Sequence, residues 1–143
     1  MQTCTKCKLA KELEEFNRSS SSANGRVKRC KKCIALYTLN RRRYSKKHIF
    51  HKHYTLMVER VLGTNPRRTY SVEGMPILSK EEYAVWLEEN MDDFDRLQAE
   101  YEREGFSKPF APSIDRIDNK KSYVADNMRW LVNHANLAKG DKV

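Results

Sequence analysis

The sequence contains no apolar run that approaches the roughly 18 residues a membrane-spanning helix needs. Its first residues also lack the pattern of a secretory signal peptide. Cysteine is absent after position 33, and hydrophobic residues make up 39% of the 143 residues. These features argue against membrane and secreted proteins. We expect a soluble, cytoplasmic protein of one domain or two small modules, with a modest core.

Acidic side chains are scarce in the first part of the chain. Residues 1–54 carry 15 basic and 3 acidic side chains, whereas residues 55–143 carry 13 basic and 16 acidic ones. Positive charge concentrated in this way is typical of a surface that binds phosphates. Nucleic acid is therefore the expected partner. The alternative is a basic face that serves solubility.

The four cysteines form two Cys-x2-Cys pairs, Cys4 with Cys7 and Cys30 with Cys33, and 22 residues separate the pairs. In a reducing compartment this spacing predicts one structural Zn²⁺ per chain, held by four thiolates. Two disulfides and a redox-active pair are the alternatives. A turn signal at Asn24-Gly25 lies between the pairs, so we expect a small zinc ribbon.

A helix is expected to start after Cys33, and its continuation is polar and basic. The basic side chains that we expect to contact nucleic acid are Arg41, Arg42, Arg43, Lys46 and Lys47. They span two turns and cannot share one face, so some face phosphate and others face solvent. His48, His51 and His53 follow. We interpret them as surface or phosphate-facing residues rather than a second zinc site, because position i+5 leaves the face that i and i+3 share.

Helices are also predicted in the middle segment, residues 55–111. One should end at Gly63, and another should begin at a capping box formed by Ser79 and Glu82. The second should break near Asn90. Its apolar residues recur at steps of three and four: Tyr83, Trp86, Leu87, Met91, Phe94, Leu97 and Tyr101. This stripe is interpreted as core, with an acidic outer face directed away from nucleic acid.

The last segment, residues 112–143, is predicted to form a strand, a loop, a strand and a helix. The strands should cover residues 113–117 and 128–132. This order brings Asp115, on the first strand, opposite Asn136, in the helix. A carboxylate and an amide oxygen suit Mg²⁺ or Mn²⁺ that takes phosphate oxygens as further ligands.

Here the sequence resembles the HNH, or ββα-metal, endonucleases, especially phage-type members that also carry a Cys4 zinc ribbon. The residues that carry the resemblance are Asp115-Arg116-Ile117-Asp118, Tyr123, Asn127-x-Arg129-Trp130 and Asn136-x2-Lys139. Charge and hydrophobic pattern divide the chain into three parts, residues 1–54, 55–111 and 112–143, and we expect an α+β fold. The resemblance, which covers residues 112–141 and less specifically 1–36, implies duplex DNA as the partner. It also implies hydrolysis of DNA phosphodiester bonds with one Mg²⁺ or Mn²⁺ per chain, bound by Asp115 and Asn136.

The resemblance gives roles to two further residues. Asn127 falls on the family's central asparagine, which ties the loop and orients the base. Lys139 matches the Asn-x2-Lys ending and is expected to reach the scissile phosphate or a neighbouring one.

Arg116 departs from the family pattern, because the family has its general base, a histidine, at this position. A guanidinium stays protonated and cannot accept the proton, but it can clamp the phosphate. Tyr123 is then our first candidate for base or nucleophile, above His134. Asp118 or a hydroxide on the metal are further candidates.

One active site per chain implies that a monomer nicks one strand. A double-strand cut needs a homodimer or two successive events. The layout is similar to phage homing, restriction or DNA-processing nucleases acting in the host cell. The alternative function is a non-catalytic zinc-ribbon protein that binds nucleic acid, in which Asp115, Asn127 and Asn136 cap turns and a helix.

Overall fold

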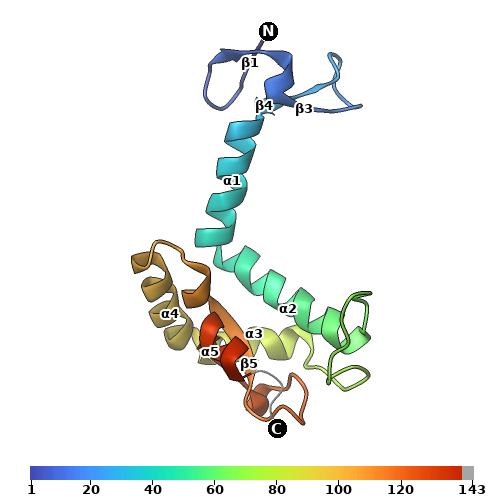
Figure 1. Ribbon diagram of the computed structural model, residues 1–143, viewed down its shortest axis with the longest axis vertical. Helices are drawn as coiled ribbons and strands as arrows, with labels where there is room; N and C mark the ends of the chain where they lie inside the picture. The colour runs from blue at the N-terminus through green and yellow to red at the C-terminus, as the bar shows by residue number, and fades with distance from the viewer. Residues whose placement is uncertain (140–143) are drawn as a thin grey trace. The chain divides into compact units, whose positions relative to one another are not determined.

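The chain folds into two compact units, residues 1–49 and 50–143 (Figure 1). The computed structural model describes residues 1–139. These residues form five α-helices and three two-stranded antiparallel sheets, which confirms the expected α+β class. The predicted division after residue 54 falls inside helix α2 (Lys46–Leu62). No helix within the described range combines the length and apolar character that crossing a bilayer requires.

The first unit consists of two small hairpins and a helix. Strand β1 (Gln2–Thr3) pairs with β2 (Ala10–Lys11), and β3 (Phe16–Arg18) pairs with β4 (Arg26–Cys30). The single turn of 3₁₀ helix η1 (Leu13–Glu15) connects the two hairpins. Such short strands cannot enclose a core between them, so side chains at their ends must hold the unit together.

The second hairpin turns at the predicted Asn24-Gly25 site. Gly25 has a φ of 71°, a left-handed conformation that glycine adopts without steric cost. Its N–H donates to the carbonyl of Ser22, and its carbonyl accepts from the N–H of Ser19, both at 2.9 Å. The turn therefore satisfies its own backbone groups and fixes how β4 enters the cysteine cluster.

Helix α1 (Lys31–Tyr44) follows β4 directly, and none of its residues is buried. The sequence predicted one helix through Lys47, but the structure divides it at Ser45. The Ser45 N–H donates to the carbonyl of Arg41 at 3.1 Å, and its hydroxyl accepts from the N–H of His48 at 3.3 Å. One serine thus closes α1 and caps α2, as expected of a good N-cap residue.

The second unit contains most of α2 and three further helices: α3 (Lys80–Glu89), α4 (Met91–Arg103) and α5 (Asn133–Lys139). The predicted capping box is present. Ser79 Oγ accepts from the N–H of Glu82 at 3.1 Å, and the Glu82 carboxylate accepts from the N–H of Ser79 at 2.6 Å. The predicted break is also present, since Asn90 separates α3 from α4.

An antiparallel hairpin connects this helical part to α5. Strand β5 (Pro112–Arg116) follows the 3₁₀ turn η2 (Lys108–Phe110), and β6 (Met128–Val132) follows the turn η3 (Ala125–Asn127). The register pairs Asp115 with Arg129 and Ile114 with Trp130. Side chains alternate between the two faces of a strand, so these two pairs lie on opposite faces of the hairpin.

One face of the hairpin completes an aromatic core. The Trp130 ring lies 4.9 Å from the ring of Phe94 and 5.6 Å from that of Trp86, measured between centroids. Both partners are almost fully buried. The predicted stripe of α3 and α4 therefore forms core, and the opposite face of the hairpin is left for α5.

Candidate functional site

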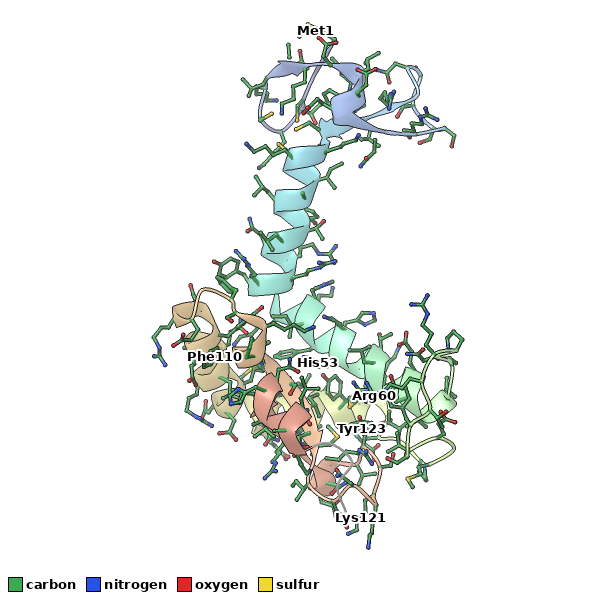
Figure 2. The ribbon with its side chains drawn as sticks, in the orientation of Figure 1. Met1, His53, Arg60, Phe110, Lys121 and Tyr123 are labelled. Atoms are coloured by element: carbon green, nitrogen blue, oxygen red, sulfur yellow. The ribbon has the colours of Figure 1, made fainter. Side chains whose placement is uncertain are left out.

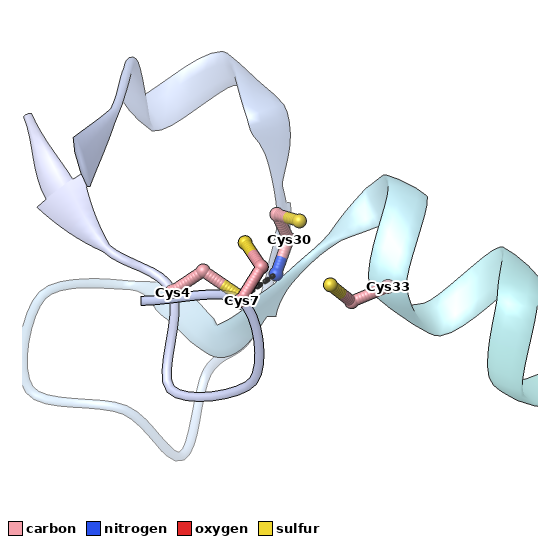
Figure 3. A group of neighbouring side chains, drawn as sticks. All are labelled: Cys4, Cys7, Cys30 and Cys33. Carbon is pink, nitrogen blue, oxygen red and sulfur yellow. Dashed lines mark hydrogen bonds between the residues drawn. The ribbon is translucent and has the colours of Figure 1, made fainter. Parts of the chain in front are cut away.

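The four cysteine sulfurs lie within 4.8 Å of one another (Figure 3). Cys4 and Cys7 come from the β1–β2 hairpin, Cys30 ends β4, and Cys33 lies in the first turn of α1. All four are free thiols, and with Phe16 they make up the core of the first unit. The cluster could hold a metal ion such as zinc.

Backbone N–H groups point at two of these sulfurs. The N–H of Cys30 donates to Cys4 Sγ at 3.3 Å, and the N–H of Lys6 donates to the same atom at 3.4 Å. N–H donation from Cys30 and Cys7 lowers the pKa of Cys4 to about 6. Donation from the N–H of Cys33 lowers the pKa of Cys30. The fold thus favours the thiolate, the form that binds metals, at Cys4 and Cys30, whereas interaction with the sulfur of Cys30 raises the pKa of Cys33.

The predicted basic residues lie on both sides of the Ser45 break. Arg41, Arg42, Lys46 and Lys47 are exposed, and Arg43 is half-buried. The guanidinium of Arg41 lies 5.8 Å from the ring centre of Tyr37, and that of Arg29, at the end of β4, lies 5.6 Å from it. An exposed aromatic ring beside two guanidinium groups therefore adds to the basic surface.

Asp115 is the centre of the second unit's polar face. Its carboxylate is 3% exposed. It accepts from Arg129 Nε at 2.8 Å and from Lys139 Nζ at 3.0 and 3.2 Å. The same ammonium donates to the carbonyls of Arg116 and Ile117. A cation therefore already lies among four oxygen atoms at the end of β5.

Asn136 lies on the same face but bonds elsewhere. Its amide nitrogen donates to Ser113 Oγ at 3.0 Å and to the carbonyl of Ile114 at 3.3 Å. No hydrogen bond within residues 1–139 joins it to Asp115. The structure thus places the two predicted ligands on one face without bringing them into contact.

Asn127 closes the loop between β5 and β6. Its side-chain oxygen accepts from the N–H of Asp118 at 2.8 Å, and its amide nitrogen donates to the carbonyls of Asp118 and Ser122, both at 3.0 Å. The side chain is buried. Replacing it would leave backbone groups of the loop without partners, so Asn127 fixes the shape of the hairpin beyond Asp115.

Arg116 and Tyr123 lie on the other side of β5. Arg116 donates to the carbonyls of Asn119 and Lys121 at 2.8 and 3.0 Å, so its guanidinium braces the loop. The buried Tyr123 accepts from Arg60 at 2.8 Å through its hydroxyl (Figure 2). Within the described part of the chain, no hydrogen bond links either side chain to the carboxylate of Asp115. Their roles as clamp and base stay predictions.

The remaining base candidates also bond away from Asp115. His134 Nδ1 lies 3.1 Å from the carbonyl oxygen of Pro109, as expected for a residue two positions before Asn136 on the helix. The carboxylate of Asp118 accepts from the N–H of Lys120 at 2.9 Å.

Sequence reasoning missed Arg129 as a site residue. The observed strand register pairs residue 129 with residue 115, whereas aligning the predicted strands, 113–117 and 128–132, pairs residue 115 with residue 130. Arg60 was missed as well, and no local pattern identifies it, since its partner Tyr123 is 63 positions away.

Comparison of the chain with protein-family models, curated proteins and solved structures finds no match.

Proposed function

We propose that this protein is an HNH-type, ββα-metal endonuclease that hydrolyses phosphodiester bonds in DNA. The buried carboxylate of Asp115 carries the proposal. Within residues 1–139 it is the one carboxylate whose side chain is buried. Burying a charge costs several kcal/mol before compensation, and removing one partner of a buried ion pair destabilises a protein by about 3–5 kcal/mol. A buried Asp beside two cations is therefore a good candidate for a functional group.

The oxygens around Asp115 fit a hard divalent cation. Both carboxylate oxygens and the carbonyls of Arg116 and Ile117 accept hydrogen bonds from the Lys139 ammonium. An all-oxygen donor set is the set that Mg²⁺ and Mn²⁺ prefer. Asp115 and these carbonyls would hold the ion once Lys139 withdraws, and Asn136 would join them after its amide turns. When bound, the ion supplies Lewis acidity toward the phosphate and lowers the pKa of water.

The protein's own cations have a clear role in the proposed reaction. Hydrolysis joins a water oxygen to phosphorus and breaks the P–O3′ bond, which leaves 5′-phosphate and 3′-hydroxyl ends. Negative charge on the phosphate oxygens increases in the transition state. Arg129 and Lys139 neutralise Asp115 here, and in the proposed reaction Arg129, together with Lys139 once it has moved away from Asp115, would stabilise that charge.

In the proposal the first unit binds the substrate. A Zn²⁺ on the four cysteines holds the unit together, because Phe16 is the one large apolar side chain in its core. The basic surface around the Ser45 break, with residues 41–43, 46 and 47, contacts DNA phosphates. Each lysine or arginine that neutralises a phosphate releases counterions, so affinity should fall steeply with salt.

One observation favours a second candidate, a non-catalytic zinc-ribbon protein that binds nucleic acid. Asp115 is already neutralised by Arg129 and Lys139. In that function these ion pairs are structural and need no metal.

Cleavage of supercoiled and linear DNA with Mg²⁺ or Mn²⁺ separates the two candidates. We expect the wild type to nick DNA, and Asp115→Asn to reduce the rate by about 10²-fold or more, the loss typical of a removed transition-state contact. Asp126→Asn is the matched control, because this exposed carboxylate lies in the same hairpin. Wild-type protein that binds DNA without cutting it under either metal would establish the non-catalytic function.

A further inference from the structure

Two arginine side chains flank one aromatic ring near the end of α2. The guanidinium carbon of Arg60 lies 5.5 Å from the ring centre of Tyr70, and that of Arg68 lies 5.2 Å from the same centre. Arg60 belongs to the last turn of α2, whereas Arg68 and Tyr70 belong to the segment that connects α2 to α3. The ring therefore holds two cations of different segments close together.

A second phenol, that of Tyr123, connects Arg60 to a residue of β5. Arg60 donates to the hydroxyl of Tyr123 at 2.8 Å, and Figure 2 shows these two side chains next to each other. The guanidinium carbon of Arg116 lies 5.6 Å from the Tyr123 ring centre, and its NH2 group donates to Ser71 Oγ at 3.1 Å. The end of α2, the segment that follows it and the distant strand β5 thus place guanidinium groups around two phenols.

The negative charge needed to balance Arg60 and Arg68 is missing from the described residues. Neither side chain forms an ion pair with a carboxylate within residues 1–139. The one acidic residue between α2 and α3 is Glu73, and its carboxylate accepts from the N–H of Tyr70 at 3.0 Å. Clustered cations without a counter-ion repel one another, and an anion that binds between them removes this repulsion.

We propose that Arg60 and Arg68, positioned by Tyr70, form a second phosphate-binding site that takes a backbone phosphate of the nucleic acid. A guanidinium group matches a phosphate with paired N–H donors, and the net charge of +9 fits a polyanionic partner better than a single small anion. The site belongs to the second unit, whereas the basic surface around Ser45 belongs to the first. The proposal shares its partner with the proposed function, but it does not require cleavage.

The test measures binding of a short labelled DNA duplex by the full-length protein across a range of KCl concentrations, without added Mg²⁺ or Mn²⁺. Arg68→Gln should weaken binding about five- to tenfold and reduce the slope of log K against log salt by about 0.9. Arg67→Gln is the matched control, because Arg67 is the exposed neighbour and its guanidinium has no ring partner within the described residues. It should leave the slope unchanged.

A second variant separates a site from general basic charge. Tyr70→Leu keeps both arginines but removes the ring that positions them, so it should also reduce the slope. An unchanged slope for Arg68→Gln, or equal losses for Arg67→Gln and Arg68→Gln, overturns the proposal. If Asp115→Asn abolishes cleavage while these slopes stay unchanged, this proposal fails and the nuclease stands. If the slopes fall but neither metal supports cleavage, the phosphate-binding site stands and the proposed nuclease function fails.

Discussion

The two units reach stability by opposite means. Residues 1–49 carry 14 basic and 3 acidic side chains around a core of four cysteines and one phenylalanine. Residues 50–143 carry 14 basic and 16 acidic side chains, and their core is built from aromatic rings around Trp130. The comparison indicates that a short segment can present dense positive charge when a cluster of four cysteines, which could hold a metal ion, stands where a larger segment has a hydrophobic core.

The largest effect expected from this difference is the unfolding of the first unit when its metal is removed. A chelator, or Cys30→Ser, should unfold the first unit, because structural zinc sites contribute about 10–16 kcal/mol. Both tryptophans, Trp86 and Trp130, belong to the second unit. Tryptophan fluorescence should therefore stay unchanged while amide NMR signals of residues 1–35 collapse. Loss of both signals together would show that the units do not fold independently.

A smaller effect is expected in the second unit, whose free energy of unfolding should depend on pH. Burial, with Lys52 and Arg60 nearby, lowers the pKa of His53 from 6.5 to about 4. The folded unit binds this proton less readily than the unfolded chain does. The neutral His53 side chain therefore favours the folded state fully above pH 6.5, and this contribution to the free energy of unfolding is lost as the pH falls toward 4. We expect a loss of up to about 1.4 kcal/mol per pH unit in that window.

Urea unfolding followed by tryptophan fluorescence measures this loss at pH 7 and pH 5. The variant His53→Gln should flatten the dependence, whereas His51→Gln, an exposed neighbour, should leave it as in the wild type. A wild-type unit equally stable at both values would contradict the assignment.

The smallest effect concerns the start of α3. Ser79→Ala removes the hydroxyl that accepts from Glu82 and should lower the free energy of unfolding of the second unit by about 1 kcal/mol. Ser107→Ala is the control, since Ser107 precedes η2 without a side-chain cap. Zinc affinity of the first unit should be the same in both variants, and a change there would mean that the two units are energetically coupled.

Local signals in the sequence predicted most of the framework. The capping box at Ser79, the turn at Gly25 and the break at Asn90 each depend on residues within a few positions. The cysteine cluster followed from spacing, because two pairs of thiols in one small unit converge on one centre.

The candidate site was harder to predict, because its contacts depend on strand faces and distant partners. Alternation along a strand already indicates that Asp115 and Arg116 face opposite sides, yet it does not say that Arg116 braces the loop. The pairing of Arg60 with Tyr123 needs the packing of α2 against the hairpin loop, which no short pattern in the sequence encodes. The division at Ser45 was hidden by the polar run on both sides of it.

The two ion pairs of Asp115 also set an order of assembly. Because Arg129 and Lys139 supply the counter-charge from within the chain, the hairpin and α5 can form in a cell before any divalent ion arrives. In the proposed function the cysteine centre depends on Zn²⁺. Supply of that metal then limits the maturation of residues 1–49, while residues 50–143 can fold as soon as they are synthesised.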